Sequence, residues 1–349
     1  MFSNIFLNRT NLLHNVSVLE DIAGGPILVM VKANGYGHGA KEIVKMLDGR
    51  IKYFGVSNQS EAEQLRQISD SNIVVFGACE DYEVCIKKKI SFALFSSNHL
   101  KQIIKLYKKL NIKPQMHLCI NTGMNRYGVK DIEEYTKIIN LLKKNKLSLE
   151  GIYTHFSSLT SDKDYTAYQH EKFMQFVQLL PDENTLIHIG GGLSIFTDFK
   201  ADLHRVGLEV YGYGNEFVKP VLSIESQIVD IQQVKKGEHV GYLCSYTAEQ
   251  DMTVATIPLG YADGLPRKLS NKLIVSIKGK KAKNIGNICM DAFMVDISHI
   301  NCKIGDRVVI MKNASDFAPL IESTEYEVLT NLSKFRGERK IILKNQKKI

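Results

Sequence analysis

The stretch Ile27-Leu-Val-Met-Val-Lys32-Ala-Asn-Gly-Tyr36-Gly-His-Gly39 joins an apolar run, a single lysine and a glycine-rich turn. An apolar run that ends at a turn is typical of a buried strand. Lys32 would then stand at the carboxyl end of that strand, where poor hydration favours the neutral amine, a nucleophile for carbonyl groups. Because most lysines are solvated surface groups, the rest of the chain has to support this interpretation.

Length and composition limit the classes of protein that fit. At 349 residues the chain is long for one ordinary core, so we expect two domains. Its 44% hydrophobic and 23% charged residues, without repeats, are typical of a globular protein. The net charge of +8 lies mainly on predicted helix faces such as Lys87-Lys88-Lys89, without interleaved aromatic residues. A solvated surface explains this charge better than binding to nucleic acid does.

The chain carries no signal for a membrane or an oxidising compartment. No apolar run is long enough to span a bilayer, and the amino terminus lacks the pattern of a secretory signal. The six cysteines form no CxxC pair, and several lie in apolar strand patterns, as buried reduced thiols do. We therefore expect a cytoplasmic protein with no membrane partner, no nucleic-acid partner and no metal site.

Short β-rich runs alternate with amphipathic helical patterns up to about residue 210. The first helix carries Leu12, Val16 and Leu19 on one face and ends at Gly24-Gly25. The predicted strands lie at 27–31, 53–56, 73–76, 91–95, 115–120, 149–154, 185–189 and 203–206. Eight strands separated by helices predict an α/β fold, a (β/α)8 barrel of parallel strands, with a doubly wound open sheet as the alternative.

The pattern changes near Pro220. Alternating segments separated by turns follow it, at 222–234, 254–258, 273–277, 293–297 and 307–310. Little helical periodicity remains there, so we expect a mostly-β domain. The predicted domains are 1–216, the barrel, and 217–349, the β domain.

Distinctive residues follow several predicted barrel strands. They are Lys32 and Tyr36 after the first, Arg126 after the fifth, His155 after the sixth, Gly190–Gly192 after the seventh and Arg205 on the eighth. Each has an ordinary structural explanation alone, but together they mark the carboxyl rim, where barrel enzymes hold their active sites. Glycines after the seventh strand commonly bind phosphate through backbone N–H groups. A nucleophilic amine, a phosphate site and nearby cations suit pyridoxal 5'-phosphate, bound through Lys32.

These residues belong to motifs that run through nearly the whole chain. The motifs are Val31–Gly39, Asn121–Arg126, Arg205–Gly207, Tyr211-Gly212, Ser245–Ala248, Pro258–Gly264 and Cys289–Asp291. The chain thereby resembles the alanine racemases, pyridoxal-phosphate enzymes of fold type III. Related barrel proteins share the lysine motif alone, whereas the later motifs in this order are specific.

The resemblance implies racemisation of L-alanine and D-alanine by two bases on opposite faces of the substrate. Lys32 would bind the cofactor and serve as the base for the D-enantiomer, and Tyr242 would serve the L-enantiomer. Tyr246, in the same motif, is the competing assignment, although the spacing to Tyr261 favours Tyr242. The family's usual role is to supply D-alanine for peptidoglycan.

By the same resemblance, His155 and Arg205 support the catalytic tyrosine, which is a poor base at its ordinary pKa near 10. Arg205 would also face the pyridine nitrogen of the cofactor. A guanidinium does not readily give up a proton, so that nitrogen would stay unprotonated. Side reactions such as transamination would then be suppressed.

The implied binding residues fall into two groups. The hydroxyls of Tyr36 and Tyr326 and the backbone N–H groups of Gly192 and Leu208 would hold the phosphate.

Arg126 and the Met290 N–H would hold the substrate carboxylate, and Asp291 would order the entrance with Tyr261. Tyr261 and Tyr326 would also narrow the pocket, so that it favours a side chain as small as a methyl group. In this family the β-domain residues serve the active site of the neighbouring subunit, so a homodimer with shared active sites is implied.

The chain departs from the family pattern at several positions. Cys119 stands where a lysine, often carbamylated, commonly positions the arginine aligned with Arg126, and we expect Asn121 or a bound anion to do so instead. Gly191-Gly192 replaces a usual Asn-Ser, which removes one hydroxyl from the phosphate site. Asn287 replaces a common arginine.

Three alternatives remain open at this point. A single-domain barrel that carries the cofactor would lack the β domain. A decarboxylase of the same architecture would need a cysteine–aspartate pair, which Cys289 and Asp291 mimic. The third is a racemase for serine or larger amino acids; broad-specificity relatives of that kind tend to be exported, whereas this sequence shows no signal-peptide pattern.

Overall fold

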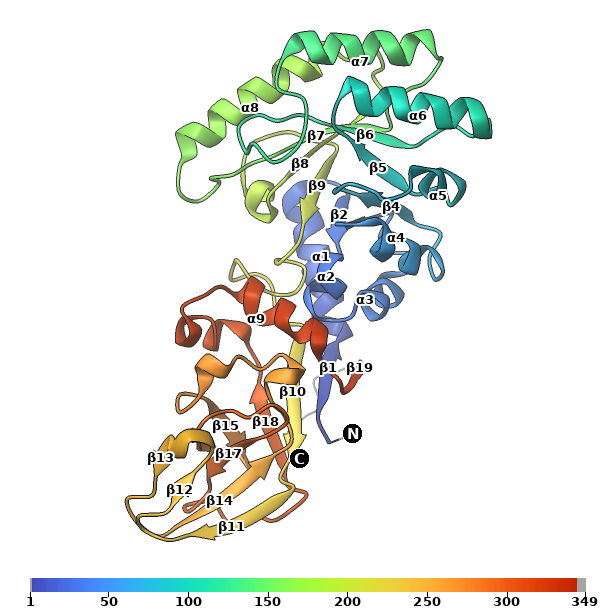
Figure 1. The fold of residues 1–349 in the computed structure, drawn as a ribbon. Coiled ribbons are helices and arrows are strands. Elements are labelled where there is room, and N and C mark those ends of the chain that lie inside the picture. Colours follow the sequence, from blue (N-terminus) through green and yellow to red (C-terminus); the bar gives the residue numbers. More distant parts are fainter. Residues whose placement is uncertain (1, 344–349) are drawn as a thin grey trace. The chain divides into compact units, whose positions relative to one another are not determined.

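The computed structural model describes residues 2–343, which form two compact units (Figure 1). The barrel unit consists of Asn15–Lys32 and Ile43–Val210. The sheet unit consists of the chain up to His14, the segment Ala33–Glu42 and the chain from Tyr211 onward. Because the units interleave along the chain, the division into 1–216 and 217–349 stays a prediction.

Eight parallel strands close into a barrel in the order of the sequence. They are β2 (Ile27–Met30), β3 (Tyr53–Val56), β4 (Asn72–Val75), β5 (Ser91–Leu94), β6 (Met116–Cys119), β7 (Gly151–His155), β8 (Leu186–Gly190) and β9 (Leu203–Val206). Every strand overlaps a predicted one. The predicted (β/α)8 barrel is confirmed, and the open-sheet alternative is wrong because β9 pairs with β2 and closes the ring.

Helices on the outside of these strands cover the barrel (Figure 1). They include α3 (Ala40–Leu47), α4 (Gln59–Arg66), α5 (Tyr82–Lys87), α6 (Ser97–Leu110), α7 (Ile132–Lys144) and α8 (Lys163–Val177), while α1 (Arg9–Ala23) precedes β2. Polar caps begin several of them. Before α7, for example, the Asp131 carboxylate accepts the N–H of Glu134. The predicted first helix, ending at Gly24-Gly25, is confirmed by α1.

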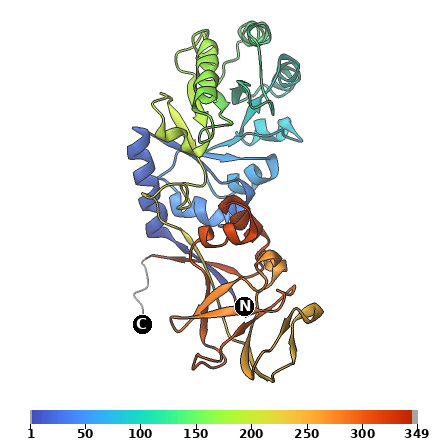
Figure 2. The same cartoon turned by 90° about the vertical axis from the view of Figure 1, so that its left-hand side faces the viewer.

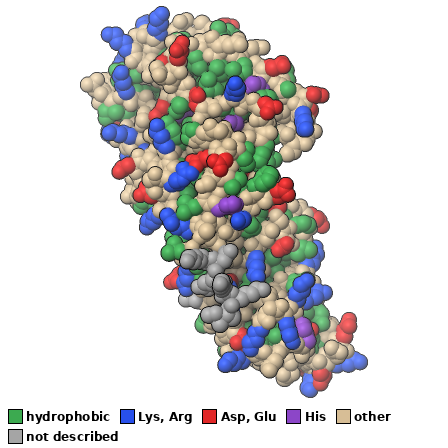
Figure 3. All heavy atoms as spheres, turned by 180° about the vertical axis from the view of Figure 1, so that it is seen from behind, with side chains coloured by type: hydrophobic (Ala, Val, Ile, Leu, Met, Phe, Trp, Pro, Cys, Tyr) green, Lys and Arg blue, Asp and Glu red, His purple; other side chains and the backbone are tan. Residues whose placement is uncertain are grey.

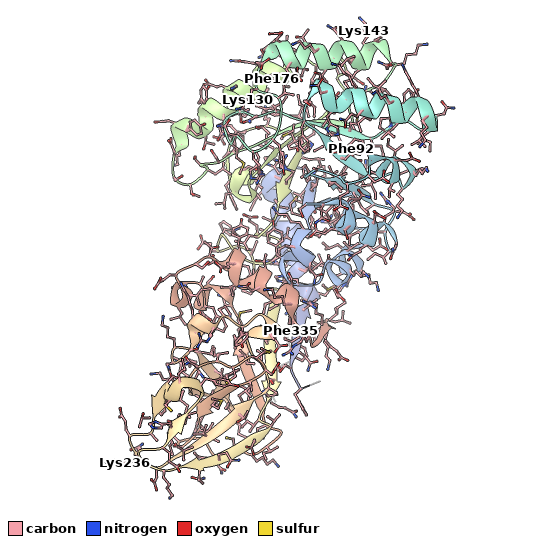
Figure 4. The ribbon with its side chains drawn as sticks, in the orientation of Figure 1. Phe92, Lys130, Lys143, Phe176, Lys236 and Phe335 are labelled. Atoms are coloured by element: carbon pink, nitrogen blue, oxygen red, sulfur yellow. The ribbon has the colours of Figure 1, made fainter. Side chains whose placement is uncertain are left out.

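Apolar residues line the inner sides of these helices. Tyr135 of α7 meets Phe176 of α8 with ring centroids 5.5 Å apart. Figure 4 labels Phe176 and, on β5, Phe92, both fully buried, and Lys143 at the exposed end of α7. This division of apolar and charged positions fixes which face of each helix covers the strands.

The sheet unit is built on a nine-stranded sheet in the order β11-β14-β17-β16-β15-β18-β10-β1-β19 (Figures 1 and 2). Its strands are β1 (Asn4–Asn8), β10 (Leu222–Gln227), β11 (Asp230–Val234), β14 (Met252–Ile257), β15 (Ile274–Ile277), β16 (Lys280–Ile285), β17 (Phe293–Asp296), β18 (Arg307–Met311) and β19 (Glu338–Ile342). A separate pair joins β12 (His239–Val240) to β13 (Tyr246–Thr247). The predicted mostly-β region after Pro220 is confirmed.

The amino-terminal strand β1 was not predicted, although it lies between β10 and β19 in the sheet. Its five residues are too few for a clear period, and the helical pattern of α1 begins directly after them. Burial of Ile5 and Leu7 on one face is what makes the segment a strand. The helix α9 (Glu325–Asn331), which carries Tyr326, was also missed because it follows a series of β patterns.

Charged side chains of both signs are dispersed among neutral ones on the face drawn in Figure 3. Within residues 2–343, no helix combines the length and apolar character that crossing a bilayer requires. The same residues contain no group of three or more His, Cys, Asp or Glu side chains that could hold a metal ion.

Candidate active site

Lys32 directly follows Val31 at the carboxyl end of β2, as predicted. Burial lowers the pKa of its amine, and the positive charges of Arg126 and Arg205 lower it further, against a smaller opposing effect of Glu61. A neutral lysine amine is a nucleophile for carbonyl carbon. The barrel unit therefore presents an activated amine at its carboxyl rim.

Arg205 of β9 is a buried cation held by several acceptors. Its guanidinium donates to His188 Nδ1 at 3.0 Å, to the Thr154 carbonyl at 2.6 Å and to His155 Nδ1 at 3.4 Å. Burial lowers the pKa of Arg205 to about 10, so it remains charged at neutral pH. These three acceptors hold the Arg205 guanidinium in one orientation.

His155 ends β7 and is neutral at physiological pH. Burial, and then the charges of Arg205, Arg126 and Lys32, lower the pKa of its ring to about 3. Because arginine can only donate, Nδ1 of His155 must accept from Arg205, and Nε2 must carry the proton. The ring therefore offers one N–H donor away from Arg205.

The glycine loop after β8 leads into a 3₁₀ turn at Gly192–Phe196. A Cβ on Gly192 would lie 1.9 Å from Oε2 of Glu209, so this carboxyl group occupies the space that a side chain at 192 would need. Glu209 accepts the N–H of Gly207 at 3.1 Å, and burial raises the pKa of its carboxyl group. Both Gly192 and Leu208, the expected phosphate donors, thus flank a buried carboxyl group that the sequence analysis did not single out.

Arg126 lies exposed in the loop after β6. The side-chain oxygen of Asn121 accepts the N–H groups of Gly123 at 3.1 Å and Asn125 at 3.0 Å. Asn121 therefore shapes the loop that carries Arg126. Within residues 2–343 no hydrogen bond or ion pair joins Asn121 to the Arg126 side chain, and the positioning of that side chain by Asn121 or a bound anion stays a prediction.

Cys119 is a buried thiol at the end of β6. Burial raises its pKa to about 11, and its sulfur donates to the Tyr127 carbonyl at 3.6 Å. The protonated thiol thus bonds the backbone of the loop that carries Arg126. It cannot supply the negative charge that a carbamylated lysine would bring to Arg126.

In the sheet unit, the turn after Lys32 is left-handed. Ala33, Asn34 and Tyr36 all have positive φ angles near 50° (52°, 54° and 51°), which non-glycine residues adopt rarely. A Cβ on Gly37 would lie 1.9 Å from the Leu329 carbonyl oxygen, and this close approach explains the glycine. The turn is therefore packed tightly against the chain's carboxyl-terminal helix.

Three tyrosines of the sheet unit gather beside this turn. The Tyr36 ring lies 5.0 Å from that of Tyr211 and 5.9 Å from that of Tyr326. The His38 ring lies 4.4 Å from that of Tyr211, and its Nδ1–H donates to the Tyr36 carbonyl at 3.0 Å. Tyr36 and Tyr326, predicted from motifs far apart in sequence, are thus brought together, and Tyr211 and His38 join them.

Tyr242 and Tyr246 lie in different surroundings. Tyr242 is 70% exposed and lines an open cavity of about 550 Å³ together with Tyr261, Arg267, Asn287 and Ile288. Tyr246 packs on a small apolar cluster. Tyr242 is therefore the more exposed of the two tyrosines.

Asn287 holds the loop of Tyr242. Its side-chain amide donates to the Tyr242 carbonyl at 3.0 Å, and its N–H bonds Ser245 Oγ at 2.8 Å. The residue that departs from the family's arginine thus supports the backbone of the candidate base.

Tyr261, Met290 and Asp291 form one group. The N–H of Tyr261 bonds the Cys289 carbonyl at 3.1 Å, and that of Ala262 bonds the Met290 carbonyl at 3.0 Å.

Arg336 connects this group electrostatically, because it pairs with Asp263 at 2.7 Å and with Asp291 at 2.8 Å. The expected substrate residues of the sheet unit are therefore adjacent.

Comparison with known proteins identifies the family. The model of the alanine racemase N-terminal domain matches residues 7–215, and that of the C-terminal domain matches residues 221–341. The chain belongs to the alanine racemase family. It is an amino-acid racemase, an isomerase.

Full-length relatives agree with this assignment. The chain is 35% identical to the alanine racemase of Fusobacterium nucleatum, over 95% of this chain and 97% of that protein. It is 32% identical to that of Desulforamulus reducens, over 93% and 94%.

The solved alanine racemase of Clostridium difficile 630 is 30% identical, covers 98% of this chain and 96% of its own, and superposes with a TM-score of 0.92. A second structure of that enzyme, in complex with cycloserine, gives a TM-score of 0.90 at 30% identity over 99% and 97%.

Several residues of the racemase's two units escaped the sequence analysis. Glu209 and Arg336 lie outside the motifs, and their partners are distant in sequence. His38 and Tyr211 stand inside motifs, where the positions could have been noticed but their ring contacts could not.

Proposed function

We propose that the racemase interconverts L-alanine and D-alanine with pyridoxal 5'-phosphate, using Lys32 and Tyr242 as the two bases. The observation that carries the proposal is the position and pKa of Lys32. Its amine lies on the same rim as Arg205 and the glycine loop, and its pKa is lowered. The family name and the alanine racemases among its relatives supply the substrate.

The residues present fit the cofactor. Lys32 offers an amine of lowered pKa for its aldehyde, and Arg205 offers N–H donors that retain their protons, for its ring nitrogen. Tyr36, Tyr326, Gly192 and Leu208 are the residues that would hold its phosphate. When bound, the cofactor withdraws electrons from the substrate and so acidifies the Cα proton.

This chain's own groups then handle that proton. Lys32 takes it from, or returns it to, the face used by D-alanine, and Tyr242 does so on the face used by L-alanine. A tyrosinate needs stabilisation at neutral pH, and the Nε2–H of His155 is a donor that is available for it. Arg205 fixes that donor by bonding the opposite nitrogen of the His155 ring.

Tyr242, we propose, serves the barrel of a second subunit. In its loop the side chains of Tyr242 and Leu243 are 70% and 86% exposed. Met290, in a different loop, is 51% exposed. Exposed apolar groups in one place favour burial against a partner. The β domain, 217–349, would then complete the active site of the partner subunit in a homodimer with two shared sites.

Subunit mixing tests the sharing of sites. Lys32→Ala and Tyr242→Phe homodimers are each inactive, but random mixing makes about half the dimers mixed, each with one intact site, so about a quarter of parental activity returns. If both bases came from one chain, mixing would restore nothing.

The substrate is tested by chiral assays with L-alanine, L-serine and L-lysine in the presence of pyridoxal 5'-phosphate. The proposal expects D-alanine as the main product, and inhibition by cycloserine, which the Clostridium difficile relative binds. Conversion of serine or lysine in preference to alanine would contradict alanine as the substrate. The single-domain carrier is excluded as an alternative by the sheet unit and its C-terminal family model.

We propose that the protein supplies D-alanine for peptidoglycan in the cytoplasm. This role follows the family's usual one, and depletion of the protein in its host, with and without added D-alanine, tests it. Growth that D-alanine rescues supports the role, and growth that it leaves unchanged contradicts it.

A further inference from the structure

A continuous line of side-chain hydrogen bonds runs through the inside of the barrel. Oε2 of Glu150 meets Nε2 of His117 at 3.2 Å, and Nδ1 of His117 meets Nε2 of His188 at 2.9 Å. Nδ1 of His188 then meets the Arg205 guanidinium at 3.0 Å. Polar side chains are costly in a barrel core, which branched apolar residues usually fill, unless every polar atom is paired.

The line joins the two ends of the barrel. Glu150 immediately precedes β7 and is held by the Ser91 hydroxyl at 2.6 Å and the Gln115 amide at 3.4 Å, both at the amino ends of their strands. Arg205 stands near the carboxyl end of β9, on the rim that also carries His155. Glu150 is therefore a partly exposed carboxylate at the end of the barrel opposite the proposed active site.

The surrounding residues leave room for this line. A Cβ on Gly151 would lie 2.4 Å from His117 Nδ1, and a Cβ on Gly190 would lie 2.1 Å from an Arg205 nitrogen. Because glycine has no Cβ, it leaves room for the His117 and Arg205 side chains at these two positions.

Aromatic rings enclose the Arg205 end of the line. The guanidinium carbon lies 4.8 Å from the Tyr153 ring and 5.1 Å from the Phe76 ring, and Tyr153 also stacks on His188. These rings exclude water, which could otherwise replace the hydrogen bond between Arg205 and His188.

Chemistry fixes the position of every proton along the line. Arginine has donors only, so His188 Nδ1 must be the acceptor and the neutral His188 ring must carry its proton on Nε2. That N–H donates to His117 Nδ1, so His117 in turn carries its proton on Nε2 and donates it to Glu150. All donors thus point from Arg205 towards the Glu150 carboxylate.

We propose that Glu150 is a remote positioning residue of the racemase, which fixes the tautomers of His117 and His188 and so holds the Arg205 guanidinium in place for the cofactor's ring nitrogen. The proposal rests on the proposed function for the role of Arg205. The tautomers themselves can be tested without it.

The physical reason lies in the charge of Arg205. No ion pair within residues 2–343 joins its buried guanidinium to a carboxylate, although it is a full cation. The Glu150 carboxylate is the anion to which its hydrogen bonds lead. Burial alone would raise the pKa of Glu150, but the hydrogen bonds that its carboxylate accepts from His117, Ser91 and Gln115 oppose this, and the pKa is lowered overall.

The first test uses the parental enzyme without cofactor. With ¹⁵N-labelled histidine, two-bond ¹H–¹⁵N correlation spectra distinguish the two neutral tautomers and the charged ring, and His117→Gln and His188→Gln assign the signals among the ten histidines. The proposal expects both rings to be neutral, with the proton on Nε2. A proton on Nδ1 of His188 would overturn it.

The second test compares three variants. Glu150→Leu removes the acceptor, so His117 and His188 should lose their single tautomer. By analogy with the hydrogen-bond partners of metal-bound histidines, kcat should fall on the order of 10–100-fold, with little change in KM. Glu150→Gln keeps a carbonyl acceptor and should retain the tautomers. Ser91→Ala, the matched control, removes another bond to the same carboxylate and should also retain them.

The outcomes separate this inference from the proposed function. A parental enzyme that racemises nothing contradicts the proposed function, whatever the tautomers are. An active parent whose Glu150→Leu variant keeps both tautomers and its kcat contradicts the positioning role. If Glu150→Leu fails to fold, the parental spectra and Glu150→Gln still decide, because Glu150→Gln with altered tautomers would also contradict the proposal.

Discussion

The barrel rim and the loops of the sheet unit present their candidate catalytic groups in opposite ways. Arg205 is buried and donates to His188, Thr154 and His155, and burial lowers the pKa values of Lys32, His155 and Arg205. Around Tyr242 the side chains are exposed and line an open cavity. Contacts within one chain thus set the pKa values of the barrel groups, whereas the proposed base Tyr242 would need a covering surface from the partner proposed above.

The largest expected effect comes from the barrel side of this comparison. Lys32→Ala removes the only amine proposed to bind the cofactor, so activity should fall to background and the visible absorbance of covalently bound pyridoxal phosphate should disappear. Absorbance spectra and a chiral alanine assay measure both. Lys41→Ala, on the exposed face of α3, is the control and should retain both signals. A cofactor spectrum that survives Lys32→Ala would contradict the assignment.

The next effect tests the sheet side. Tyr242→Phe should keep the bound-cofactor spectrum but lose roughly 10²–10⁴-fold in kcat, the usual contribution of a general base. Tyr246→Phe, which packs on the apolar cluster, should remain active. Full activity in Tyr242→Phe together with loss in Tyr246→Phe would reverse the assignment.

A smaller effect is expected at the glycine loop of the barrel. Gly192→Ser must displace Glu209, because the new Cβ would lie 1.9 Å from its carboxylate oxygen, and overpacking of this kind typically costs about 1–3 kcal/mol. The Tm should fall and cofactor binding should weaken, as measured by thermal unfolding and titration with pyridoxal 5'-phosphate. Gly192→Ser with Glu209→Ala makes room for the hydroxyl and should recover both. Unchanged binding in the single variant would show that Glu209 moves freely.

The smallest effect is a dependence of stability on pH. In the folded protein the pKa of His155 is lowered to about 3 and that of His38 to about 4, whereas an unfolded histidine titrates near 6.5. Below about pH 6.5 the unfolded chain takes up protons that the folded one does not. Stability is therefore complete above that pH and falls as the pH drops, by up to about 1.4 kcal/mol per unit for each such group.

Urea unfolding at pH 7.5 and pH 5.5 measures this loss. His38→Gln, in the sheet unit, should reduce the difference between the two pH values. A free energy of unfolding that does not change over this range would show that the buried histidines charge without cost.

The residues on the barrel rim could be predicted from the sequence, whereas the hydrogen bonds inside the barrel could not. Lys32 follows an apolar run that predicts a buried strand, His155 ends another strand, and Arg205 lies near the end of a third, so topology places them on one rim. His117, His188 and Glu150 carry no comparable signal. Each looks like a single polar residue in or beside a strand, and only barrel closure brings them into line.

On the sheet side the motifs placed Tyr242, Tyr261 and Asp291 correctly in one unit. What holds them could not be predicted, because Asn287 acts through a backbone carbonyl and Arg336 through ion pairs across the fold. The way in which Asn121 acts on the loop of Arg126 could not be predicted for a similar reason. Its oxygen is taken by the backbone of its own loop, which was invisible without the loop's conformation.

The most direct test of the two-base account is ¹H NMR of Cα exchange in D₂O, with the parental enzyme and Tyr242→Phe, each given L-alanine or D-alanine. We expect the parent to introduce deuterium at Cα and invert both enantiomers. We expect Tyr242→Phe to exchange the Cα proton of D-alanine through Lys32 without inverting it, and to leave L-alanine unlabelled. If Tyr242→Phe labelled and inverted both enantiomers as fast as the parent, Tyr242 would not be the second base and the account would be wrong.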